Sequence, residues 1–117
     1  MTDFYYETTG KNDDITVVVL SGRLDSTSAE YVFSCVENRV KDGSRKIVLD
    51  CTSLQYISSM GLGMLLRVHS RLKKVDGDAN VAGVNSTVAK VIAMVRLDTV
   101  LHLYSTVDEA VAALEAE

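Results

Sequence analysis

The stretch Ser58-Ser-Met-Gly-Leu-Gly63 decides the fold of this chain, because it joins a strand to a helix. It follows Lys46-Ile-Val-Leu-Asp-Cys-Thr52, a pattern typical of a buried strand, and it opens a helix predicted to run to about Lys74. The first N–H groups of a helix have no partner within it, and the helix dipole adds positive charge there. Such a turn can hold a serine hydroxyl as a cap or a phosphate as an anion. Ser59 is therefore a candidate N-cap, a candidate modification site, or both.

On either side of this turn, strands alternate with single helices. Apolar residues recur at helical spacing after Thr27-Ser-Ala-Glu30, a plausible capping box, and Gly43 is expected to end that helix. Ser86 is expected to cap a third helix, and Thr106-Val-Asp-Glu109 predicts a capping box for the last. The expected strands cover residues 4–9, 15–20, 46–52, 79–84 and 100–104.

The resulting order of elements, ββαβαβαβα, predicts an α/β fold. Strands separated by single helices favour right-handed crossovers and a largely parallel sheet. The first two strands are separated only by a polar turn at residues 10–14, so we expect them to form a hairpin. We expect a single domain over residues 1–117, with one mixed sheet of four or five strands and about four helices packed on its faces.

Composition argues against several classes of protein. Of the 117 residues, 47% are hydrophobic, the net charge is −4 and no basic stripe is visible, so nucleic acid is not an expected partner. No apolar run approaches the roughly 20 residues that cross a membrane, and the first residues do not resemble a signal peptide. These features predict a cytoplasmic protein. Cys35 and Cys51 form no CxxC pair and are expected to be reduced thiols.

No residue pattern typical of catalysis or of metal binding is visible. His69 and His102 are isolated, and no Cys/His/Asp spacing indicates a metal site. Gly61-Leu-Gly63 lacks the third glycine of a dinucleotide loop, and a Walker-type loop is absent. The small residues are expected instead to let the start of the helix approach neighbouring backbone. We therefore expect no enzyme activity, no cofactor and no bound metal.

Three segments, taken together, resemble the STAS domain and, within it, the bacterial anti-sigma factor antagonists. They are Gly22-Arg-Leu-Asp25, Ile47-Val-Leu-Asp50 and Tyr56-Ile-Ser-Ser-Met-Gly-Leu-Gly63. The resemblance covers nearly the whole chain and implies the STAS fold. It also implies partner switching, in which the unphosphorylated antagonist binds an anti-sigma factor serine kinase of the GHKL type. Phosphorylation of one serine ends that binding, and a PP2C-type phosphatase restores it.

The resemblance places the phosphoacceptor at Ser59, because the family turn Asp-Ser-(Ser/Thr)-Gly-Leu-Gly aligns on the two glycines. The family aspartate then falls on Ser58 and the second hydroxyl on Met60, so the chain departs from the pattern and Ser58 is the alternative acceptor. Asp25 matches an aspartate near the acceptor, or else caps the following helix. At least one methionine of the turn is expected to be exposed. The residues expected to contact a partner are Asp25, Ser58, Ser59, Met60, Gly61, Leu62 and Met64.

A second function is compatible with the same fold, because function resides in sites rather than in folds. The chain would then be an accessory or scaffold protein of another system, such as an anion transporter, and would not be phosphorylated. A serine at the turn of a chain of this length favours the partner-switching function. The sequence assigns neither a sigma factor nor an oligomeric state.

Overall fold

The structure is a computed structural model, and it describes residues 2–117. A five-stranded sheet has the order β1-β2-β3-β4-β5, in which β1 pairs antiparallel with β2 and the other neighbours are parallel. This mixed sheet confirms the predicted α/β fold and element order. The elements are β1 (Thr2–Thr9), β2 (Ile15–Leu24), α1 (Ser26–Lys41), β3 (Lys46–Ile57), α2 (Ser59–Lys74), β4 (Asp78–Ala82), α3 (Ser86–Met94), the 3₁₀ turn η1 (Leu97–Thr99), β5 (His102–Tyr104) and α4 (Val107–Glu115).

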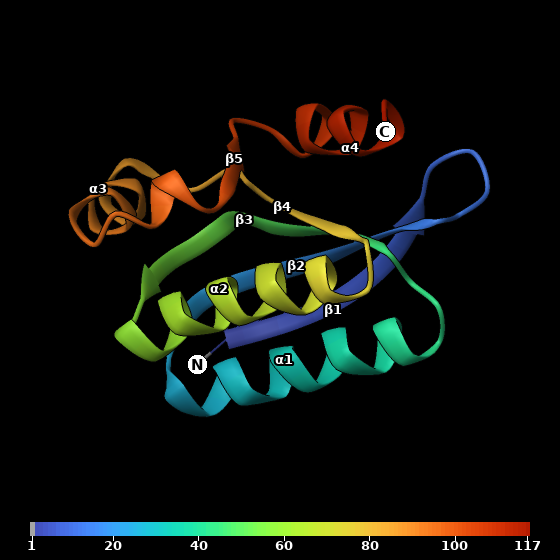
Figure 1. Cartoon of the computed structure of the whole chain (residues 1–117). Coiled ribbons are helices and arrows are strands. Elements are labelled where there is room, and N and C mark those ends of the chain that lie inside the picture. The colour runs from blue at the N-terminus through green and yellow to red at the C-terminus, as the bar shows by residue number, and fades with distance from the viewer. Residues whose placement is uncertain (1) are drawn as a thin grey trace.

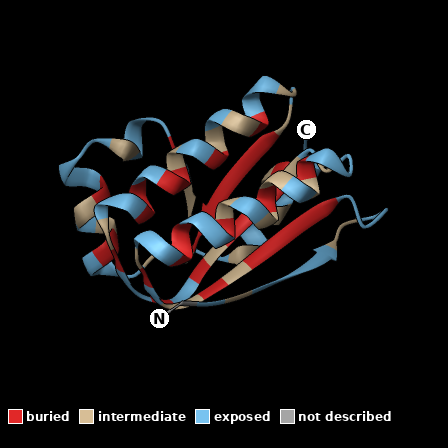
Figure 2. Ribbon diagram, turned by 90° about the horizontal axis from the view of Figure 1, so that it is seen from below, coloured by how far each residue is buried: buried red, intermediate tan, exposed pale blue. Residues whose placement is uncertain are grey.

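The helices cover both faces of the sheet (Figure 1). Helices α1 and α2 lie side by side on one face, α4 lies on the other, and α3 lies at one end of the molecule. Each helix turns its buried residues toward the sheet and its exposed residues toward solvent (Figure 2). This division follows from the helical spacing of apolar residues in the sequence.

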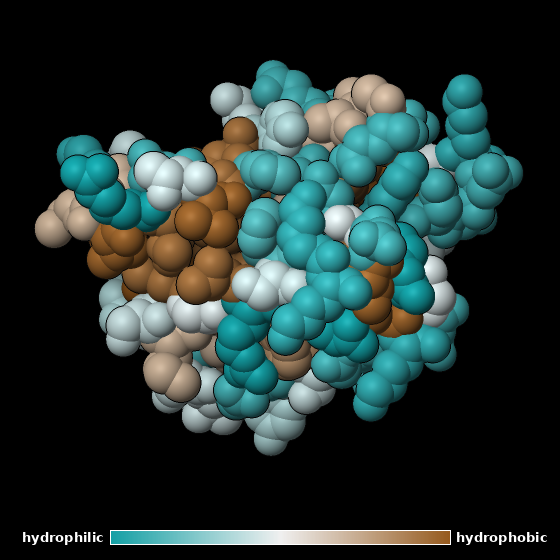
Figure 3. Space-filling model, in the orientation of Figure 1, coloured by the Kyte–Doolittle hydropathy of each residue, from teal (hydrophilic) through white to brown (hydrophobic). Residues whose placement is uncertain are grey.

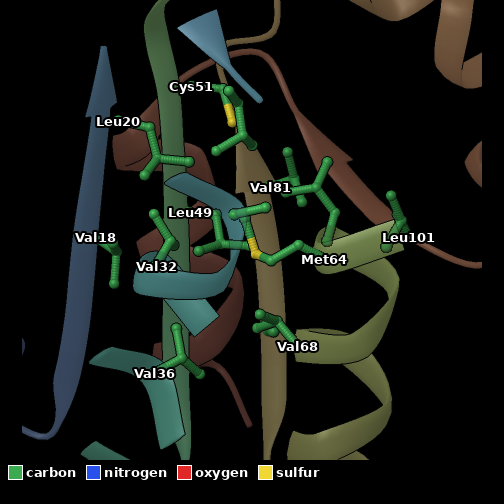
Figure 4. Close-up of a cluster of buried hydrophobic side chains, with 14 of the residues drawn as sticks. Val18, Leu20, Val32, Val36, Leu49, Cys51, Met64, Val68, Val81 and Leu101 are labelled. Atoms are coloured by element: carbon green, nitrogen blue, oxygen red, sulfur yellow. The ribbon is translucent and has the colours of Figure 1, made fainter. Parts of the chain in front are cut away.

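Apolar side chains form a core on each face of the sheet. Under α1 and α2, valines and leucines of the strands meet those of the helices, as Figure 4 shows for Val18, Leu49, Val36 and Val68. The smaller cluster under α4 contains Ile15, Val17, Val48, Ala82, Ala110 and Leu114. The core under α1 and α2 fixes these two helices relative to the sheet, and therefore fixes the start of each helix at the ends of β2 and β3.

Strands β2 and β3 are longer than the sequence predicts. The sequence predicts strand ends at Leu20 and Thr52, but the strands continue to Leu24 and Ile57, and these two last residues are paired in register. The pairing has two register shifts, at each of which β3 holds one extra residue. Such bulges interrupt the alternation of apolar and polar residues by which a strand is recognised in a sequence. The longer strands carry Asp25 and the serine turn to the same edge of the sheet.

The other strand boundaries differ by a few residues, and two of the predicted helix caps are wrong. Helix α1 starts earlier than Thr27-Ser-Ala-Glu30, because its N-cap is Asp25. Helix α3 is capped by Asn85 rather than Ser86, whereas Thr106 caps α4 as predicted. All of these residue types are good caps, so a run of several such residues does not by itself reveal which one is used.

Candidate functional site

The paired ends of β2 and β3 bring Asp25 and the serine turn together. The Leu24 carbonyl accepts a hydrogen bond of 2.9 Å from the Ser58 amide, one residue beyond the Leu24–Ile57 pair. Asp25 therefore follows Leu24 at the point where Ser58 follows Ile57. The carboxyl ends of parallel strands are the usual position of functional residues in such sheets.

Ser58, and not Ser59, is the N-cap of α2. Its backbone is extended, with φ −84° and ψ 170°, and its Oγ accepts a hydrogen bond of 3.1 Å from the Gly61 amide. Ser59 is the first residue of the helix, and it is exposed. The expectation that Ser59 serves as the cap is therefore wrong by one residue. Serine and aspartate cap helices about equally well, so Ser58 can serve in place of the aspartate of the family turn.

Asp25 caps α1 through a reciprocal pair of hydrogen bonds with Ser28. One carboxylate oxygen of Asp25 accepts from the Ser28 amide at 3.0 Å and from its hydroxyl at 2.8 Å, while the Asp25 amide donates to that hydroxyl at 3.1 Å. The amide and then the hydroxyl of Ser28 lower the pKa of the Asp25 carboxyl below its ordinary value. Asp25 is therefore a fixed negative charge at neutral pH, beside the start of α2.

Gly61 allows the start of α2 to lie close to β2. A Cβ at position 61 would lie 2.8 Å from the Ile57 side chain and 2.9 Å from the Leu24 carbonyl oxygen. A Cβ at Gly63 would have no neighbour within 4 Å. The expected close approach to backbone therefore occurs at the first glycine of the turn and not at the second.

The apolar residues of the turn divide between surface and core. Met60 is 54% exposed, which agrees with the expectation that at least one methionine of the turn is exposed. Leu62 is 6% exposed and Met64 is 1% exposed, and both belong to the core under α1 and α2. These two residues and Gly61 are buried behind the turn, and a role for them in partner binding stays a prediction.

Beside Met60, the first turns of α1 complete a shallow surface hollow that the sequence did not predict. It is lined by Met60 of α2 and by four residues of α1, namely Ser26, Thr27, Glu30 and Tyr31. Tyr31 is 66% exposed, and the Glu30 carboxylate lies 2.9 Å from the Arg67 guanidinium. Tyr31 falls outside the apolar stripe of α1, and an exposed aromatic residue off that stripe is the sequence feature from which this surface could have been predicted.

Figure 3 shows a separate apolar area between α3 and α2. The exposed residues of α3 and its C-terminal end include Met94 and Val95.

The two histidines, isolated in sequence, meet in the structure. The ring centroids of His69 and His102 are 5.4 Å apart in an edge-to-face arrangement, and His102 Nδ1 lies 3.4 Å from an Asp78 carboxylate oxygen. Burial, followed by the charges of His102 and Lys73, lowers the pKa of His69.

Within residues 2–117, no three His, Cys, Asp or Glu side chains are grouped as metal ligands. The same part of the chain contains no helix with the length and apolar character to span a membrane.

The sequence matches a model of the STAS domain family over residues 6–110. BtrV of Bordetella bronchiseptica, whose name assigns it provisionally to the anti-sigma factor antagonists, is 37% identical over 71 residues, which are 61% of this chain and 61% of BtrV. The chain therefore matches about three fifths of the length of that relative. The anti-sigma F factor antagonist of Paenibacillus polymyxa is 28% identical over 86% of this chain and 87% of its own length.

Solved structures share the fold. An anti-sigma factor antagonist from Mycobacterium paratuberculosis superimposes with a TM-score of 0.86 at 24% identity, over 97% of this chain and 94% of that one. The Bacillus cell fate determinant SpoIIAA in its phosphorylated form superimposes with a TM-score of 0.75 at 22% identity, over 95% of this chain and 98% of that one. A sulfate transporter family protein from Wolinella succinogenes superimposes with a TM-score of 0.77 at 13% identity, over 88% of this chain and 86% of that one. At these identities the structures show the fold alone.

Proposed function

This chain belongs to the STAS domain family, and on that basis we propose that it is an anti-sigma factor antagonist that acts by partner switching. Unphosphorylated, it binds an anti-sigma factor serine kinase of the GHKL type. Phosphorylation of Ser59 by that kinase ends the binding, and a PP2C-type phosphatase restores it. The chain itself has no catalytic role, because the kinase and the phosphatase supply the chemistry.

The observation that supports this proposal most directly is the position of Ser59. Its side chain is exposed on the first residue of α2, whereas the Ser58 hydroxyl is already engaged by the Gly61 amide. In the transfer, Ser59 Oγ bonds to the γ-phosphorus of ATP, the bond to the β–γ bridging oxygen breaks, ADP leaves, and a base of the kinase takes the hydroxyl proton. Ser58 is the weaker candidate, because its phosphorylation would disturb the cap.

A phosphate on Ser59 would act through charge at the interface, without refolding the protein. It adds about −1.5 to −2 charges at neutral pH, and the start of a helix tolerates an anion because of its free N–H groups and its dipole. A partner that covers the turn would have to desolvate this charge, next to the fixed carboxylate of Asp25. Since each 1.4 kcal/mol changes affinity about tenfold, a cost of several kcal/mol would release the partner.

Asp25 has a proposed role in presenting Ser59 to the kinase. Position 58 has no carboxylate here, so Asp25 provides the negative charge at the strand end next to the turn. Asparagine caps helices about as well as aspartate but carries no charge. Asp25→Asn is therefore expected to keep the cap, to melt at a near-native temperature at neutral pH, and to change the rate of Ser59 phosphorylation several-fold. An unchanged rate would leave Asp25 with its capping role alone.

A pull-down from native lysate tests the proposed function, with wild type, Ser59→Ala and Ser59→Asp as baits. Wild type and Ser59→Ala should retain a GHKL-type kinase, and Ser59→Asp should not. The purified kinase with ATP should phosphorylate wild type on Ser59, as located by site-resolved mass spectrometry. Phosphate only on Ser58, or equal retention of the kinase by all three baits, would contradict the proposal. Retention of a membrane transporter regardless of residue 59 would instead favour the accessory function.

A further inference from the structure

We propose that Met60 and Tyr31 form the surface by which this chain selects its kinase, and that the hollow between them receives one uncharged apolar side chain of that kinase. This inference rests on the proposed function and specifies how the same site recognises its partner. It concerns Met60, which follows the acceptor serine, and Tyr31, which lines the same hollow, and neither takes part in the phosphoryl transfer.

The geometry favours contact with whatever binds Ser59. Met60 directly follows Ser59 and is 54% exposed, while Tyr31, which is 66% exposed, lines the same hollow from α1. The two helix starts are held in place by their caps, Asp25 for α1 and Ser58 for α2. The hollow therefore exists before a partner arrives, and its formation costs little on binding.

The charges of the hollow favour an uncharged occupant. Of the five residues that line it, only Glu30 is charged at neutral pH, and its carboxylate is paired with Arg67 at 2.9 Å. Among the residues that line the hollow, a charged side chain would find no unpaired opposite charge to compensate for lost hydration. Leucine, isoleucine, methionine or phenylalanine would bury apolar surface against Met60 and Tyr31. Methionine adapts its shape to a partner, and tyrosine offers a large contact area at a low entropy cost.

Residue 60 also determines the shape and polarity of the surface next to the acceptor. A kinase fitted to a short polar residue beside the acceptor would meet the longer, apolar side chain of Met60 here. A recognition site can reject a related partner by such a difference in shape and polarity. Because Met60 adjoins Ser59, a phosphate on Ser59 would place its charge beside the apolar contact and disrupt it.

The test uses the purified kinase that phosphorylates Ser59, with isothermal titration calorimetry of single variants. Met60→Ser and Tyr31→Ser should each weaken binding about tenfold, the usual size of an effect from a central apolar contact. The fold-loss of affinity in the double variant should be smaller than the product of the two single losses, since both residues contact the same side chain of the kinase. Met60→Leu should bind within about threefold of wild type. Met94→Ser, which alters an 82% exposed methionine on α3, is the matched control and should bind like wild type.

Thermal melts of each variant distinguish loss of binding from loss of fold. Because all the substituted side chains are exposed, the variants should melt at the same temperature as wild type. The inference is overturned if Met60→Ser binds within about twofold of wild type, or if Met94→Ser weakens binding as much as Met60→Ser. Either result leaves the proposed function intact as long as the kinase still phosphorylates Ser59. If no kinase binds wild type in preference to Ser59→Asp, the proposed function fails and this inference fails with it.

Discussion

At the scale of single residues, two adjacent serines have different physical roles. Ser58 accepts a hydrogen bond from the Gly61 amide, whereas Ser59 is exposed on the first residue of α2. Ser58→Ala should therefore destabilise the protein by about 1 kcal/mol through loss of the cap, and Ser59→Ala should change stability by less than about 0.5 kcal/mol. Urea denaturation measures both. Ser58→Asp, which restores the family residue, should be at least as stable as wild type, and a larger loss for Ser59→Ala would contradict the assignment of the cap.

The Asp25 carboxylate stabilises α1 only while it is ionised. Its pKa is lowered in the folded state by Ser28, so in mild acid the unfolded chain binds more protons than the folded protein does. The stabilisation is complete above the ordinary carboxyl pKa of about 4 and is lost as the pH falls through the lowered value. The melting temperature of wild type minus that of Asp25→Asn should therefore decrease from pH 6 to pH 3. A constant difference would show that the charge does not contribute.

The sequence located this site but did not resolve its details. The turn at residues 58–63 and its proximity to Asp25 follow from the order of strands and helices, because parallel strands end at one edge. The identity of the capping serine could not be predicted, since both serines are good caps and the register depends on the bulges of β3. Tyr31 is recognisable in the sequence as an aromatic residue off the apolar stripe of α1, but the hollow beside it depends on how α1 lies next to α2.

At the scale of elements, the first turn of α2 lies close to the end of β2 because residue 61 has no side chain. Gly61→Ala should destabilise the protein by about 1–3 kcal/mol, since its Cβ would lie 2.9 Å from a backbone oxygen that cannot move freely. Gly63→Ala is the matched control, because its Cβ meets nothing within 4 Å and alanine favours helix by up to about 1 kcal/mol. Chemical denaturation should show a lower free energy of unfolding for Gly61→Ala and a higher one for Gly63→Ala than for wild type. Equal effects would indicate that helix propensity dominates at both positions.

The elements themselves follow from local patterns more reliably than their ends do. Apolar periodicity and β-branched runs predicted all five strands and four helices in the correct order. The end of β3 was missed because Thr52 and Ser53 interrupt the apolar pattern while backbone pairing with β2 continues. Pairing is a contact between segments distant in sequence, so it can extend a strand beyond its own apolar pattern.

At the scale of the whole molecule, the core under α1 and α2 can be monitored through one thiol. Cys51 is fully buried in that core, and burial raises its pKa to about 12 (Figure 4). Cys35 is only half-buried, although burial raises its pKa as well. Since the thiolate is the reactive form, Cys51 should react with a thiol reagent only when the protein opens.

Thiol labelling of the native protein tests this expectation. A chromogenic disulfide reagent should modify Cys35 first and leave Cys51 unreacted. In the Cys35→Ser variant, labelling of Cys51 should accelerate with urea in proportion to the fraction unfolded, because the thiol lies where the sheet, α1 and α2 meet. If Cys51 reacts in native buffer as fast as Cys35 does, this face of the sheet opens locally. Because α1 and α2 position Tyr31 and Met60, such opening would also mean that the hollow is not preformed.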